Sequence, residues 1–154
     1  MARRTPTTFF TLGYEATTQA RLIDRLKQEG VKTLIDVRDV ANSRRAGFSK
    51  KALAASLDEA GIAYIHLRAL GTPKAGRIAN RAGRMAEFEE IYERAFQEPQ
   101  AQLALREAAD LARAAPAALL CYCADGAKCH RNRIAQGLEE MGLKRRELRF
   151  DPVG

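Results

Sequence analysis

The sequence contains few of the residues that cross-link small proteins: three cysteines and two histidines among 154 residues. An odd number of cysteines, two of them separated by one residue, indicates free thiols and a reducing compartment rather than a disulfide framework. The chain also lacks any apolar run close to the ~18 residues of a membrane span, and no apolar segment of a secretory signal follows its first residues. We therefore expect a cytoplasmic protein without a membrane partner.

The composition is typical of a globular domain, because hydrophobic residues make up 46% of the chain and neither a repeat nor a low-complexity segment is evident. We expect a flexible basic tail over residues 1–7 and a single domain over residues 8–154, long enough to fold around its own core. The net charge of +7 favours an anionic partner, such as a nucleic acid, a nucleotide or another phosphate compound. A merely basic surface would give the same charge.

Short apolar segments alternate along the chain with segments of helical periodicity. Strands are predicted at residues 8–12, 33–37, 62–67, 119–123 and 146–150, with helices between most of them. This alternation predicts one three-layer α/β domain, with a mostly parallel sheet of about five strands and helices on both faces. The glycine-rich and basic segment 68–84 is predicted to be a long loop.

The carboxyl ends of the predicted strands carry polar or reactive side chains: Tyr14, Asp36, Arg38, His66 and Cys123. Open parallel sheets bind ligands at these ends. Since the ends of parallel strands meet at one edge, we expect these side chains to line one pocket together with His130 and Arg131. The segments 44–50 and 68–84 are expected to cover that pocket.

All three cysteines lie within residues 119–133, where a predicted strand leads into a helix. The N-terminus of that helix presents free N–H groups and the positive end of a dipole, which favour an anion or a thiolate. Cys123 is therefore a candidate nucleophile, with His130 and His66 as candidates for proton transfer. A second buried thiol without chemistry explains Cys123 equally well, and Cys121 is assigned to the core.

The same region raises the question of a zinc site formed by Cys123, Cys129 and His130, with His66 as a further ligand. The spacing of two cysteines with five residues between them, followed directly by a histidine, is not one of the usual zinc patterns. Adjacent ligands are also awkward for one tetrahedral ion. We therefore predict no metal and no cofactor.

A basic loop follows the second predicted strand and contains Arg44, Arg45 and Lys50. Two arginines beside a helix N-terminus are suited to bidentate phosphate contacts. Phe48 lies between the charges, where it could stack on a base or pack against the start of the helix. A solvated run of charge is the simpler alternative.

A series of short motifs follows in a fixed order: Gly13-Tyr14-Glu15, Leu34-Ile35-Asp36-Val37-Arg38, Ser43-Arg44-Arg45-Ala46-Gly47-Phe48-Ser49, Tyr64-Ile65-His66-Leu67, Leu70-Gly71 and Cys129-His130-Arg131. Together they resemble the family known as domain of unknown function 488, over about residues 8–138. The resemblance implies an α/β domain whose motif residues gather at one site. It implies no particular reaction, because the members of the family are uncharacterised.

A second similarity, limited to a few residues, concerns the chemistry. Asp36-Val37-Arg38 and the loop from Tyr122 to Lys128 are similar to the rhodanese pattern of an acid–arginine strand end and a cysteine loop. In that pattern the backbone N–H groups of the loop hold a persulfide or an anion. The similarity implies a sulfurtransferase-like role for Cys123.

Three functional hypotheses remain open from the sequence. The first is a module that binds a phosphate-containing ligand or nucleic acid through these side chains: Tyr14, Asp36, Arg38, Arg44, Arg45, Lys50 and Arg131. The second is a cysteine-dependent enzyme of the sulfurtransferase type that uses Cys123. The third is a structural subunit without chemistry. The sequence does not favour any oligomeric state.

Overall fold

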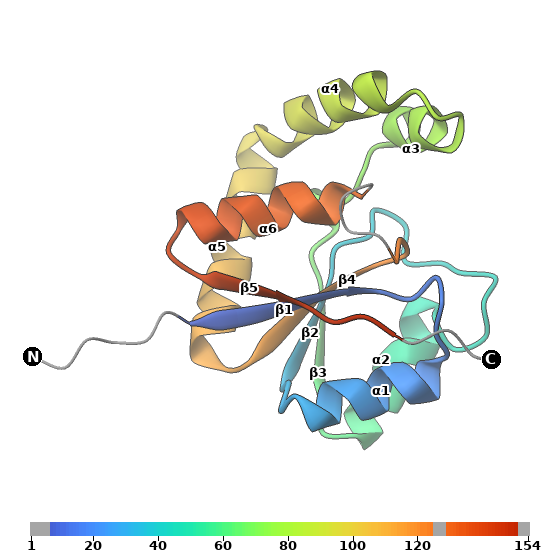
Figure 1. The fold of residues 1–154 in the computed structure, drawn as a ribbon, viewed down its shortest axis with the longest axis vertical. Coiled ribbons are helices and arrows are strands. Elements are labelled where there is room, and N and C mark those ends of the chain that lie inside the picture. The colour runs from blue at the N-terminus through green and yellow to red at the C-terminus, as the bar shows by residue number, and fades with distance from the viewer. Residues whose placement is uncertain (1–6, 125–128, 151–154) are drawn as a thin grey trace, which may run out of the picture.

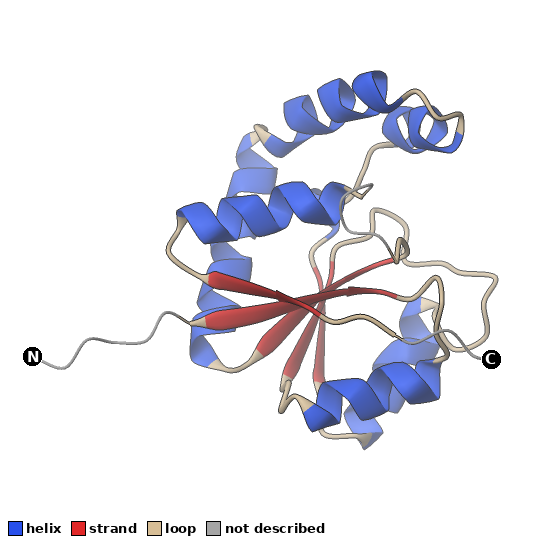
Figure 2. Ribbon diagram, viewed as in Figure 1, coloured by secondary structure: helices blue, strands red, loops and turns tan. Residues whose placement is uncertain are grey.

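Five short strands form one parallel sheet at the centre of the molecule (Figure 1; Figure 2). The computed structural model describes residues 7–124 and 129–150. The strands are β1 (Thr8–Gly13), β2 (Thr33–Asp36), β3 (Ala63–His66), β4 (Ala117–Cys121) and β5 (Lys144–Glu147). Their order across the sheet is β3-β2-β4-β1-β5, and every neighbouring pair is parallel. The predicted fold class is confirmed, with a sheet that is entirely rather than mostly parallel.

Helices cover both faces of this sheet (Figure 2). One face is covered by α1 (Gln19–Gln28) and α2 (Lys50–Glu59). The opposite layer contains α3 (Lys74–Arg81), α4 (Met85–Phe96), α5 (Pro99–Ala114) and α6 (His130–Glu140). Among the described residues, none of these helices has the length and hydrophobicity that crossing a membrane would require.

Neighbouring residues along a strand point into different halves of the core. On β4, Leu119 and Cys121 belong to the cluster with α4, α5 and α6. Ala118 and Leu120 belong to the cluster with α1 and α2. This alternation on a strand that is apolar throughout follows from burial on both faces.

The segment 68–84, predicted to be a loop, instead contains a short 3-10 helix (Arg68–Leu70) and the helix α3. Its glycines suggested a loop, but Gly76 lies inside α3 where a larger side chain does not fit. A Cβ atom on Gly76 would lie 2.7 Å from Thr72 Cγ2 and 3.3 Å from Ile91 Cγ2. The glycine therefore permits close packing of α3 on α4 rather than an irregular chain.

The last predicted strand also differs, because β5 spans Lys144–Glu147 and ends before the buried Leu148. Of the predicted basic tail 1–7, only Thr7 lies within the described residues. The Thr7 carbonyl accepts a hydrogen bond from the Lys144 N–H at 2.8 Å. The backbone pairing between the first and last strands thus extends to this residue.

The position of β4 determines which loop lies at the middle of the carboxyl edge. β4 lies between β1 and β2, and the chain after it leads to α6 on one face of the sheet. The chains after β1 and β2 lead to α1 and α2 on the opposite face (Figure 1). Where the connections after neighbouring strands lead to opposite faces of a parallel sheet, a crevice forms outside the carboxyl ends of these strands. Parallel sheets bind ligands in this crevice. Cys123 lies directly after β4 at this point.

Gly13 allows the end of β1 to pass close to the Cys123 loop. A Cβ atom on Gly13 would lie 1.8 Å from the Cys123 carbonyl oxygen. The following residues, Tyr14 and Glu15, donate backbone hydrogen bonds to the carbonyls of Cys121 and Tyr122 at 3.2 and 2.8 Å. The path of the chain beyond β4 therefore depends on the absence of a side chain at residue 13.

We expect Gly13→Ala to lower the free energy of unfolding by about 3 kcal/mol, because the added methyl group meets backbone atoms that cannot turn away. Gly61→Ala is the matched control. Its Cβ would meet no atom within 4 Å, so only the positive φ of 76° opposes it, at about 1 kcal/mol. Urea unfolding followed by circular dichroism measures both variants. Equal destabilisation would contradict the close approach at Gly13.

Candidate functional site

The three cysteine side chains meet at the carboxyl end of β4. Cys121 is the last residue of β4, Cys123 follows two residues later, and Cys129 directly precedes α6. The Cys121 and Cys129 sulfurs are 2.7 Å apart, and the Cys121 thiol also lies 3.9 Å from the Cys123 carbonyl oxygen. All three are free; Cys121 and Cys129 are buried, whereas Cys123 is partly exposed. One thiol of the cluster is thus accessible to a dissolved reagent.

The pKa of Cys123 is lowered in this cluster, whereas the pKa values of Cys121 and Cys129 are raised. Hydrogen bonds from Cys121 and Cys129 lower the pKa of Cys123 well below its usual value, and the charge of Arg131 adds to this effect. Burial raises the pKa of Cys121 to about 12. Burial also raises the pKa of Cys129, and its hydrogen bonds with the other two sulfurs raise it further. A partly exposed thiolate therefore lies beside two protonated thiols.

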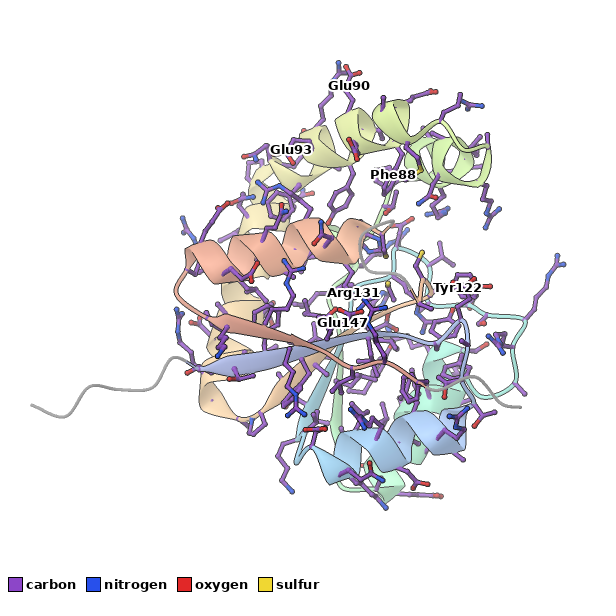
Figure 3. The ribbon with its side chains drawn as sticks, in the orientation of Figure 1. Phe88, Glu90, Glu93, Tyr122, Arg131 and Glu147 are labelled. Carbon is purple, nitrogen blue, oxygen red and sulfur yellow. The ribbon has the colours of Figure 1, made fainter. Side chains whose placement is uncertain are left out.

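Arg131 is fully buried rather than placed on the rim of a pocket. Its guanidinium group donates to Cys121 Sγ at 3.1 Å and to the Cys123 carbonyl at 2.9 Å. It also donates to Thr11 Oγ1 at 2.5 Å and to Glu147 Oε1 at 3.0 Å. In Figure 3, Arg131 and Glu147 lie beside one another, and Tyr122 lies further along toward the end of β4. Arg131 thus connects β1, β4, β5 and α6, and this arrangement favours a positioning role.

Both histidines contact backbone carbonyls that follow β2. His130 Nε2 lies 2.7 Å from the Val37 oxygen, and His66 Nε2 lies 2.6 Å from the Arg38 oxygen. A carbonyl only accepts hydrogen bonds, so the Nε2 of each ring carries a proton. Burial lowers the pKa of His130 despite its bond to Val37. Its Nδ1 lies 3.5 Å from Cys129 Sγ, where it can accept the proton of that thiol.

Asp36 and Arg38 form a buried ion pair that fastens the loop after β2. The Arg38 Nη2 lies 2.7 Å from Asp36 Oδ2, and the Arg38 Nε and backbone N–H also donate to this carboxylate. The other end of the guanidinium donates to the Tyr14 hydroxyl at 3.2 Å and to the Phe48 carbonyl at 2.8 Å. Tyr64 donates to Asp36 Oδ2 at 2.5 Å. Residues from four of the sequence motifs therefore meet here.

The aromatic rings of Tyr14 and Phe48 stack beside this ion pair, with centroids 4.4 Å apart. Phe48 thus packs in the core and does not present its ring to solvent. Burial lowers the pKa of Arg38, but the hydrogen bond and charge of Asp36 outweigh it and the pKa rises overall. Like the guanidinium group of Arg131, that of Arg38 forms its hydrogen bonds and ion pair with groups within the protein.

The basic loop after β2 is attached to the edge of the sheet at several points. Arg45 donates to the backbone carbonyls of Tyr14 and Glu15, and Gln19 Nε2 donates to the Gly47 carbonyl at 2.7 Å. Arg44 and Lys50 are exposed on the same segment. These two side chains are therefore better placed than Arg38 or Arg131 to contact an external anion.

Several residues that contribute to the site were not predicted from the sequence. The Glu15 carboxylate accepts the Ala124 N–H at 3.1 Å, directly after Cys123. Thr11 and Glu147 accept hydrogen bonds from Arg131. Their polar side chains within predicted strands were the only sequence feature that pointed to a buried polar partner. Asp125 and Lys128 lie outside the described residues. Among the residues that are described, no three acidic, histidine or cysteine side chains are arranged to hold a metal ion.

An open hollow with a volume of about 400 Å³ lies beside the chains that follow β2 and β3. Its lining includes Asp39, Arg68 and Gln100 but not Cys123. Arg68 and Arg77 pair with Asp39 at 3.4 and 2.6 Å. The positive charges beside this hollow are thus balanced by a carboxylate.

Comparison with known proteins identifies the family but provides no functional precedent. Residues 18–138 match the family model described as Domain of unknown function DUF488. No curated protein and no solved structure matches the chain. The match includes the Asp36–Arg38 pair and the thiol cluster, and begins after Gly13. The family match confirms the resemblance that the sequence motifs indicated. The comparisons do not show a similarity to rhodanese.

Arg131→Lys keeps the positive charge but removes the fork of donors that reaches Thr11 and Glu147. We expect the free energy of unfolding to fall by about 3 kcal/mol, because the polar groups around the buried guanidinium lose hydrogen-bond donors that a lysine cannot replace. Arg133→Lys on the same helix is the matched control. It alters a half-exposed pair with Glu93 and should cost about 1 kcal/mol or less. Similar losses in urea unfolding would contradict the buried role of Arg131.

Proposed function

The chain belongs to the DUF488 family, whose function is unknown, and we propose that it binds an anionic substrate at the carboxyl edge of the sheet and attacks it with Cys123. One observation carries the proposal. Cys123 is the partly exposed member of a three-thiol cluster whose other two members are buried with their sulfurs 2.7 Å apart, and hydrogen bonding within this cluster lowers the pKa of Cys123. A thiolate held in this way is the nucleophilic form of cysteine.

The surroundings of Cys123 support a role in catalysis over that of an inert core thiol. Arg131 holds the Cys123 carbonyl at 2.9 Å, so the backbone of the nucleophile is fixed. A buried inert cysteine would have a raised pKa, as Cys121 has, whereas hydrogen bonds lower that of Cys123. His130 lies beside the cluster and can accept a proton.

The charge of the substrate follows from the exposed cations near this edge. Arg44 lies on the loop that Arg38 fastens to β1 and β2, and Lys50 is the first residue of α2 at the end of that loop. The protein carries a net charge of +7, which attracts anions such as phosphate compounds. Tyr122 is about half exposed and contacts the Tyr14 ring edge-on, with centroids 5.3 Å apart. An aromatic side chain at this position offers an apolar surface to the uncharged part of a substrate.

We expect alkylation of Cys123 by iodoacetamide to vary less than about threefold between about pH 6 and pH 8, since a lowered pKa keeps the thiolate populated throughout this range. An ordinary thiol with a pKa near 8.5 would slow roughly 75-fold over the same range. Peptide mass spectrometry of the wild type gives the site and rate, with N-acetylcysteine as the reference thiol. A rate for Cys123 that follows the reference thiol would contradict the proposed nucleophile.

Pyrophosphate should protect Cys123 from alkylation if an anionic substrate binds beside it. We expect the double variant Arg44→Ala, Lys50→Ala to need roughly fivefold to tenfold more pyrophosphate for the same protection, because two charge-assisted contacts are lost. The matched control is Lys27→Ala, Arg106→Ala, which removes the same charge from exposed positions on α1 and α5. Equal protection of both double variants would exclude Arg44 and Lys50 from the binding site.

A further inference from the structure

We propose that Cys121 and Cys129 are a redox-active dithiol that closes to a disulfide after a hydroperoxide has oxidised Cys123. The disulfide removes the thiol hydrogens that Cys121 and Cys129 supply to the cluster and so lowers the reactivity of Cys123. The inference rests on the proposed role of Cys123 as a nucleophile. It adds a modification site and a means of regulation that this role does not itself require.

The geometry of the buried pair favours a disulfide. The Cys121 and Cys129 sulfurs are 2.7 Å apart, and a disulfide bond of about 2.05 Å needs a further approach of less than about 1 Å. The two residues lie on separate elements, at the end of β4 and directly before α6. Cys121 and Cys123 are instead separated by one residue, and the Cys121 sulfur contacts the Cys123 carbonyl oxygen, at 3.9 Å.

Accessibility determines the order in which the thiols react. Cys121 is 1% exposed and Cys129 is 5% exposed, whereas Cys123 is only partly buried. A dissolved hydroperoxide therefore meets Cys123 first. Sulfur oxidation by peroxides also requires thiolate character, and in this cluster the thiolate is Cys123.

In the first step the Cys123 thiolate attacks the terminal oxygen of the hydroperoxide. The O–O bond breaks, Cys123 becomes a sulfenic acid, and an alkoxide or hydroxide leaves. In the second step the Cys129 sulfur attacks the Cys123 sulfur and the S–O bond breaks. The departing hydroxide takes the Cys129 proton as water, and His130 Nδ1, 3.5 Å from Cys129 Sγ, can carry that proton.

In the third step the Cys121 sulfur attacks Cys129, and Cys123 leaves as a thiolate. Cys123 is the best leaving group of the three because its pKa is the lowest. The Cys121 proton neutralises the alkoxide or hydroxide released in the first step. In sum, two thiols lose two electrons and two protons, and the hydroperoxide is reduced to an alcohol and water, or to water alone.

The product differs from the reduced protein in the environment of Cys123. Neither sulfur of a disulfide carries a hydrogen, so the two thiol donors that stabilise the Cys123 thiolate disappear. Burial then acts against the charge, and the thiolate population falls near neutral pH. The oxidised protein therefore contains a protected, less reactive Cys123, and reduction of the disulfide restores its reactivity.

The test treats reduced protein with one equivalent of hydrogen peroxide, blocks the remaining thiols with N-ethylmaleimide, and maps the peptides by mass spectrometry. In the wild type we expect a Cys121–Cys129 disulfide and a blocked Cys123. Cys129→Ser should retain a sulfenic acid on Cys123 that dimedone traps, and Cys121→Ser should accumulate a Cys123–Cys129 disulfide. Oxidation of wild-type Cys123 without any bonded pair would overturn the proposal, and this arm needs no variant.

Cys123→Ser provides the control for the route. The buried pair should stay reduced in this variant at the same dose of peroxide, and a disulfide formed as fast as in the wild type would refute oxidation through Cys123. In the oxidised wild type, alkylation of Cys123 at about pH 6 should fall at least tenfold and recover with dithiothreitol. An unchanged rate would refute the regulatory effect. The pH dependence of the reduced protein tests the nucleophile separately, so the two proposals can fail independently.

Discussion

The arrangement of the carboxyl edge depends on the buried guanidinium group of Arg131. This one side chain on α6 reaches Thr11 on β1, Glu147 on β5 and the Cys123 carbonyl beyond β4. A buried cation without such partners would cost several kcal/mol, so the helix and the three strand ends are held in one relative position. The thiol cluster is built on this framework, because Cys121 Sγ is also a partner of the guanidinium group.

Arg38 plays the same structural part for the loops on the other side of β4. It binds Asp36 on its own strand end, and its far nitrogen reaches Tyr14 and Phe48 from two other segments. The two arginines with the deepest burial at this edge therefore stabilise loops, and the charge left for an external anion lies on exposed side chains such as Arg44. The carboxyl edge of the sheet is therefore held in place by buried arginines, while exposed basic side chains give it positive charge.

The alternation of strands and helices, and the residues at the strand ends, could be predicted from the sequence because they depend on local periodicity and on a general property of parallel sheets. The burial of Arg131 could not, since its partner Thr11 lies 120 residues away and no local pattern links them. Helix α3 was missed because Gly76 resembles a loop residue until its close contact with Thr72 and Ile91 is known. The contact between Cys121 and Cys129 likewise depends on how α6 returns to the sheet.

The reactivity assigned to Cys123 comes from the whole β4–α6 connection rather than from a helix N-terminus alone. Three thiols packed together cannot each ionise, because like charges repel and burial opposes each of them. The pKa is lowest at the sulfur that water reaches, and burial raises the pKa of the two other sulfurs. The burial that makes Cys121 and Cys129 poor nucleophiles thus makes them effective donors. A change in their oxidation state must then alter Cys123, since the donors and the dithiol are the same atoms.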